Sequence, residues 1–158
     1  MTILGIDPGL ARTGYAVLET KNNKIKTIVY GCFVTQAKSP LERRLLQIYS
    51  DITKIIKKHK PEKMAIEQLF FGKNVKSALL VGQARGLAFL AAAQGKIPIY
   101  EFTPPQIKQG LTDYGNADKS QIQKMLKIIL NLKNVPTPDD AADALAIAYC
   151  CLQARSFA

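Results

Sequence analysis

Three strand-like segments follow one another at the start of the chain, and this succession limits the possible folds more than any other feature. Residues 3–7 form a short apolar run that ends at Pro8-Gly9, and residues 14–19 form a second such segment. Residues 25–34 are rich in β-branched side chains, and Asn22-Asn23 before them is typical of a hairpin turn. Because short turns join the three segments, we expect an antiparallel meander.

The clearest helix signal comes directly after the meander. Ser39, Pro40 and Glu42 have the spacing of a capping box with proline in the first helical position. Apolar residues then recur at helical spacing from Leu41 to Ile56, and most basic residues lie off this stripe. We therefore expect an amphipathic helix with Ser39 as its N-cap.

Strands and helices alternate in the rest of the chain. We expect strands at 63–67 and 97–102, and helices at 75–94, 105–111, 119–131 and 140–153. A meander followed by such alternation predicts an α/β fold with a mixed five-stranded sheet flanked by helices. Three of its strands would be antiparallel and the last two parallel. The length suits one domain, and we take residues 1–158 as that domain.

Two carboxylates stand where predicted strands end. Asp7 closes the first strand, and Glu67 closes the apolar run Met64-Ala65-Ile66. A charged residue at the end of a buried strand lies at the rim of the sheet, where a ligand can reach it. The alternative for either residue alone is an ordinary surface acid, because strand ends meet water.

Two further carboxylates lie in the first turn of the last predicted helix. Asp140 and Asp143 are three residues apart, so they share one face of that helix. The partial positive charge of a helix N-terminus keeps carboxylates ionised and able to hold a metal. Capping by Asp139 or Asp140 is the alternative. Asp143 precedes a largely apolar stretch that should be buried, which favours a role beyond capping.

Four gathered carboxylates need positive charge near them. Two like charges about 4 Å apart repel by roughly 4 kcal/mol at an effective dielectric constant near 20. The short segments around Asp7, Glu67, Asp140 and Asp143 contain no lysine or arginine, so either distant basic side chains or cations must balance them. Oxygen ligands without histidine or cysteine favour Mg²⁺ or Mn²⁺.

The charge of the whole chain indicates a polyanionic partner. Lysine and arginine number 22 against 12 acidic residues, a net charge of +10, which is typical of nucleic-acid binding, with solubility alone as the alternative. No apolar run reaches the roughly 20 residues of a membrane span, and the opening residues do not resemble a signal peptide. The odd number of cysteines favours reduced thiols. We therefore expect a cytoplasmic protein with no membrane contact.

Several segments together resemble the motifs of the RuvC family of crossover junction endodeoxyribonucleases. The matching stretches are Ile3-Leu4-Gly5-Ile6-Asp7-Pro8-Gly9 with Thr13-Gly14-Tyr15, Ala65-Ile66-Glu67-Gln68 with Phe70, Lys73 and Asn74, Gly82-Gln83-Ala84-Arg85-Gly86, Lys119-Ser120-Gln121, and Asp140-Ala141-Ala142-Asp143-Ala144-Leu145-Ala146. They run over nearly the whole chain in the order of the family. The resemblance implies a ribonuclease H-like fold.

The resemblance also implies an activity and the residues that carry it. It implies resolution of Holliday junctions in homologous recombination and DNA repair, by paired metal-dependent nicks that leave a 5′ phosphate and a 3′ hydroxyl. The implied site residues are Asp7, Glu67, Asp140 and Asp143, which would bind two Mg²⁺ ions with Mn²⁺ able to replace them, and the DNA-binding residues Phe70, Lys73, Lys108 and Lys119. Phe70 would stack on an unpaired base, and the lysines would hold phosphates. Core packing of Phe70 and solvated surface lysines are the alternatives.

The implied partners are four-way junction DNA, a second copy of the chain and the RuvA–RuvB branch-migration complex. A junction presents two strands to be cut and one chain carries one carboxylate cluster, so resolution requires a two-fold dimer. The apolar helix at 75–94 is our candidate for the interface, with packing on its own sheet as the alternative. The alternative functions are another ribonuclease H-like nuclease and a non-catalytic basic DNA-binding protein.

Overall fold

A computed structural model describes residues 1–68, 75–112 and 118–154, without the side chains of residues 75–77. The elements are β1 (Thr2–Asp7), β2 (Arg12–Lys21), β3 (Lys24–Val34), α1 (Leu41–His59), β4 (Lys63–Glu67), α2 (Val75–Gln94), β5 (Ile99–Phe102), α3 (Pro104–Thr112), α4 (Lys119–Ile129) and α5 (Asp139–Gln153). Their order confirms the predicted order of strands and helices. The predicted Phe70 and Lys73 contacts lie outside the described residues.

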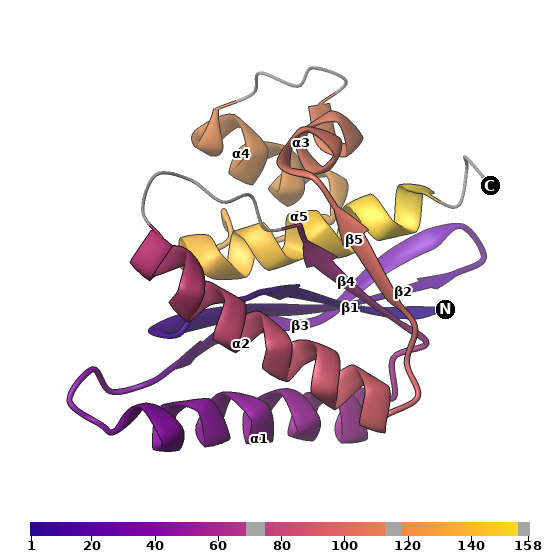
Figure 1. The fold of residues 1–158 in the computed structure, drawn as a ribbon. Helices are drawn as coiled ribbons and strands as arrows, with labels where there is room; N and C mark the ends of the chain where they lie inside the picture. Colours follow the sequence, from indigo (N-terminus) through magenta and orange to yellow (C-terminus); the bar gives the residue numbers. More distant parts are fainter. Residues whose placement is uncertain (69–74, 113–117, 155–158) are drawn as a thin grey trace.

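The sheet is mixed, as predicted. Its strand order is β3-β2-β1-β4-β5, with β1, β2 and β3 antiparallel and with β4 parallel to both β1 and β5. Helices α1 and α2 cover one face of the sheet, and α5 covers the other with α3 and α4 beside it (Figure 1). The central strand β1 is therefore buried on both faces, which explains its short apolar sequence.

The turns and caps confirm some local expectations and correct others. Asn22 and Asn23 both have positive φ, 52° and 59°, as a two-residue hairpin turn requires. The predicted capping box at Ser39 is wrong, because Pro40 is extended (φ −52°, ψ 145°) and itself occupies the N-cap position of α1. Capping of α5 by Asp139 or Asp140 is also wrong, because Pro138 is the N-cap residue and no side chain caps this helix.

Strand β5 begins two residues later than predicted. The amide of Ile97 still donates to the carbonyl of Ala92, so Ile97 belongs to the turn that ends α2. The first register pair with β4 is that of Ile99 with Met64.

Within the residues that the structure describes, none of the helices has the length and apolar character needed to cross a membrane. The described residues contain no disulfide; Cys150 and Cys151 are buried, whereas Cys32 is only partly buried.

Candidate active site

Strand alternation places Asp7 and Glu67 on the face of the sheet that α5 covers. Side chains alternate between the faces of a strand. Ile6 and Ile66, which are register partners on β1 and β4, pack with α1 and α2 on the opposite face. The next residue on each strand is the carboxylate, so Asp7 and Glu67 stand side by side at the carboxyl ends of parallel neighbours, facing α5.

Two glycines let α5 approach the sheet closely enough to complete the site. A Cβ atom added at Gly14 would lie 1.9 Å from the carbonyl oxygen of Asp140, and one added at Gly5 would lie 2.3 Å from that of Ala144. The backbone of α5 therefore rests directly on β1 and β2. This contact carries Asp140 and Asp143 to the edge where Asp7 and Glu67 end.

The carboxylates act on one another electrostatically. Burial, followed by repulsion from Asp143, Glu67 and Asp140, raises the pKa of Asp7 to about 7. Burial and then Asp143 raise the pKa of Glu67. Burial also raises the pKa of Asp143, although the nearby Lys119 opposes this shift. The cluster therefore carries more negative charge than its surroundings balance.

Basic side chains from other segments balance part of that charge. Lys119 Nζ lies 3.2 Å from Asp143 Oδ2 and 3.3 Å from Asp139 Oδ2, and Arg12 Nη1 lies 3.7 Å from Asp140 Oδ2. Burial alone would lower the pKa of Lys119, but Asp143 and Asp139 outweigh it and the pKa is raised. Two of the candidate ligands are thus already engaged by cationic side chains.

The carboxylates do not form a ready-made coordination sphere. Among residues 1–68, 75–112 and 118–154, no set of three or more His, Cys, Asp or Glu side chains lies close enough to hold a metal ion. Asp143 is paired with Lys119, and Asp140 is paired with Arg12. Binding of one metal by all these carboxylates would require the two ion pairs to open.

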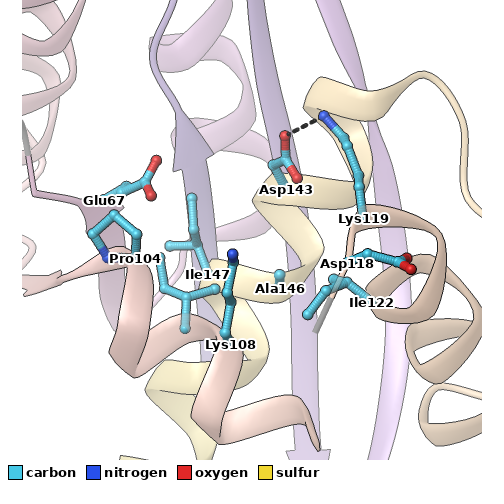
Figure 2. A pocket seen from close by; sticks show the side chains of 10 residues that line it. Glu67, Pro104, Lys108, Asp118, Lys119, Ile122, Asp143, Ala146 and Ile147 are labelled. Carbon is cyan, nitrogen blue, oxygen red and sulfur yellow. Dashed lines mark hydrogen bonds and ion pairs between the residues drawn. The ribbon is translucent and has the colours of Figure 1, made fainter. Parts of the chain in front are cut away.

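A cavity of about 310 Å³ lies between Glu67 and Asp143. Figure 2 shows Glu67 and Asp143 on opposite sides of it, with Lys108 reaching toward the space from α3 and Lys119 beside Asp143. Its remaining lining consists of Pro104, Ile107, Asp118, Ile122, Ala146 and Ile147. Carboxylates and lysines that face one cavity suit a ligand that carries both a cation and phosphate oxygens.

The structure brings together six of the eight predicted site residues: Asp7, Glu67, Asp140, Asp143, Lys108 and Lys119. Sequence reasoning missed Arg12, because nothing in its neighbourhood distinguishes it from the other basic residues. It also missed the capping box in which Asp118 and Gln121 fix the start of α4. That spacing was readable in the sequence, and it places Lys119 at the first position of the helix.

Comparisons with known proteins agree with this architecture. The family model for crossover junction endodeoxyribonuclease RuvC matches residues 3–151. The crossover junction endodeoxyribonuclease RuvC of Desulforamulus reducens is 53% identical over 150 residues, which cover 95% of this chain and 92% of the relative. The structure of Thermus thermophilus RuvC superposes with a TM-score of 0.89 at 34% identity, covering 99% of this chain and 97% of that one.

A second Thermus thermophilus structure was determined in complex with a Holliday junction substrate. It superposes with a TM-score of 0.90 at 31% identity, covering 99% of this chain and 96% of that one. The mixed five-stranded sheet and its flanking helices are thus those of the ribonuclease H-like RuvC structures. This chain belongs to the RuvC family of crossover junction endodeoxyribonucleases.

Proposed function

We propose that this chain resolves Holliday junctions in homologous recombination and DNA repair, with Asp7, Glu67, Asp140 and Asp143 as its catalytic, metal-binding carboxylates. The observation that carries the assignment is the convergence of these side chains on one edge of the sheet, where their repulsion helps to raise the pKa of Asp7 to about 7. Membership of the family and the Thermus thermophilus complex with a Holliday junction support the substrate.

The residues present fit a divalent metal. RuvC proteins are metal-dependent nucleases, and the donors here are carboxylate oxygens, which suit Mg²⁺ and Mn²⁺. The uncompensated charge of the cluster is a second argument, because a divalent cation relieves repulsion that Lys119 and Arg12 relieve only in part. We propose two Mg²⁺ ions per site, with Mn²⁺ able to replace them. When bound, the ions supply Lewis-acid chemistry at the scissile phosphate.

We propose that Lys108 and Lys119 hold phosphate oxygens. Both line the cavity next to Glu67 and Asp143. Lys119 is paired with Asp143, so engagement of Asp143 by metal would leave the ammonium group free to contact DNA. A lysine suits this exchange, because its ammonium is a mobile point charge on a flexible stem. The proposed products are a 5′ phosphate and a 3′ hydroxyl.

Phe70 and Lys73 complete the proposed DNA-binding set. They follow Glu67 by three and six residues in the sequence. We propose that Phe70 stacks on an unpaired base near the junction centre, which is worth about 1–3 kcal/mol per base.

We also propose that residues 1–158 act as a single nuclease domain in a cytoplasmic homodimer that works with the RuvA–RuvB complex. The exposure of α2 supports the dimer, because Ala84, Ala88, Ala91 and Ala92 are buried in the core while Leu79 and Leu90 remain 62% and 49% exposed. Exposed leucines on a helix are expected where a second protein surface covers them.

A nicking assay on a synthetic mobile four-way junction tests the function. We expect paired nicks only when Mg²⁺ or Mn²⁺ is present. Faster cleavage of an RNA–DNA hybrid would favour another ribonuclease H-like nuclease. Junction binding without any cleavage in metal would favour a non-catalytic DNA-binding protein.

A further inference from the structure

We propose that Arg85 is a positioning residue that fixes the end of β4 so that Glu67 presents its carboxylate to the metal site. We propose further that Glu101 holds the Arg85 guanidinium away from that carboxylate. The inference rests on the proposed function, because the placement of Glu67 matters only if Glu67 binds metal.

Arg85 joins three elements at the carboxyl end of β4. Its Nη1 donates to the backbone carbonyl of Glu67, and its Nη2 donates to Oε2 of Glu101 on β5. Its guanidinium carbon lies 4.8 Å from the ring centroid of Phe89, one helical turn further along α2. The Arg85 side chain is only 13% exposed, so these contacts hold it in one orientation.

Glu67 lies at the point where the hydrogen-bonded part of β4 ends. It is the last residue of β4, and its register partner Phe102 is the last residue of β5. The ladder continues for one more bond, 2.8 Å from the Gln68 amide to the Phe102 carbonyl. A bond from Arg85 to the Glu67 carbonyl fixes the peptide plane that follows Glu67. It thereby sets the direction in which the Glu67 side chain leaves the backbone.

The positive charge of Arg85 is balanced by Glu101, outside the proposed metal site. Glu101 is the register partner of Ile66, one residue before Glu67, and it forms an ion pair with Arg85. Among the described residues, the guanidinium bonds the Glu67 carbonyl and the Glu101 carboxylate, and no ion pair joins it to the Glu67 carboxylate. Arg85 bonds the backbone of a proposed metal ligand, and Glu101 balances the charge of the guanidinium. Arg85 can therefore orient Glu67 without competing with the metal ion for its carboxylate.

Calorimetric titration of metal-free protein with Mn²⁺ tests the proposal directly, without DNA or cleavage. We expect Arg85→Ala to weaken Mn²⁺ binding by about 10–100-fold, as loss of a group that orients a metal ligand does. Arg85→Lys should recover part of the affinity, because one ammonium can bond the carbonyl but lacks the planar fork that reaches both acceptors. Arg43→Ala, which removes the same charge from an exposed site on α1, should bind as wild type.

Backgrounds that lack one ligand separate positioning from general stability. Arg85→Ala should have no further effect on Mn²⁺ binding in Glu67→Gln, because the group it positions is gone. It should still weaken binding in Asp7→Asn. Equal losses in both backgrounds would show a merely structural role and overturn the inference.

Glu101→Gln provides a second variant in case Arg85→Ala fails to fold. It frees the guanidinium to pair with the Glu67 carboxylate, so Mn²⁺ should bind more weakly; unchanged binding would overturn the role of Glu101. Wild-type Mn²⁺ affinity and cleavage in Glu67→Gln would overturn the proposed function itself. Impaired Glu67→Gln with unaffected Arg85→Ala would overturn only this inference.

Discussion

Replacing Asp7 by asparagine should make the metal-free protein more stable while it removes the activity. Folding moves this carboxyl group into a partly buried site among three other acids, where its pKa rises from 3.8 to about 7. A raised carboxyl pKa means that the folded state holds the proton more tightly, so stability is lost as the pH rises from about 4 to about 7. Asparagine has almost the same shape and carries no charge, so it avoids this loss.

The magnitude follows from the size of the shift. About three pKa units correspond to about 4 kcal/mol at pH 8, and relaxation of the site reduces this to about 2–4 kcal/mol. For a domain of this length each kcal/mol moves the melting temperature by about 2–4 °C, so we expect an increase of about 5–15 °C. At pH 5 the increase should be less than half as large, because the wild-type carboxyl group is then protonated in the folded state.

Calorimetric melting in chelator at pH 8 and pH 5 measures this difference. Asp139→Asn, in the first turn of α5, is the control, because hydrogen bonding by Gln123 and Lys119 lowers the pKa of Asp139 and the variant should gain no stability. Cleavage by Asp7→Asn should fall by roughly a hundredfold or more, while junction binding survives or tightens. An Asp7→Asn variant that melts at or below the wild-type temperature at pH 8 would refute the reasoning.

Four further predictions follow from the site. Mg²⁺ should raise the melting temperature slightly and switch on cleavage, Mn²⁺ should replace it, and Ca²⁺ should support junction binding with little cutting; full activity in excess chelator would contradict the metal mechanism. Lys119→Ala should weaken DNA binding across sequences and reduce the slope of log affinity against log salt by about one, measured by fluorescence anisotropy; an unchanged slope would exclude a phosphate contact. Phe70→Ala should slow cutting of an intact junction, and a junction with unpaired bases at its centre should restore the cleavage rate. If cleavage is not restored and the variant loses about 3–5 kcal/mol of stability, Phe70 is a core residue. Gly14→Ala should lower the free energy of unfolding by about 1–3 kcal/mol or more and abolish cleavage, because the new Cβ would clash with the Asp140 carbonyl. Gly110→Ala should be tolerated, because its Cβ would meet nothing closer than 3.5 Å. Equal effects of the two variants in thermal melting would contradict the close approach of α5.

The parts of the fold that depend on local pattern could be predicted from the sequence. Apolar runs, turn residues and helical spacing identified every element in order, and β4 and α2 have the predicted bounds. The start of α1 was misjudged, because the capping pattern at Ser39 ignores the extended backbone that Pro40 adopts there. Local rules describe which conformations a residue favours, and a neighbouring proline can exclude them.

The pairing of distant side chains could not be predicted in the same way. Arg12 meets Asp140 and Lys119 meets Asp143 only because α5 lies across β1 and α4 folds back beside it. The close approach at Gly5 and Gly14 is equally invisible in the sequence, since glycine in a strand also occurs at bulges. The four carboxylates could be proposed as site residues from the sequence, because their spacing and surroundings indicate metal chemistry.

The contact of α5 with Gly5 and Gly14 determines when the carboxylate cluster assembles during folding. The meander can pair as soon as it leaves the ribosome, but β4 reaches β1 only after about sixty residues, and α5 docks after about seventy more. Until α5 settles on the two glycines, a growing chain holds Asp7 and Glu67 without Asp140 and Asp143. The proposed metal site is therefore complete only when the last helix closes over the first strand.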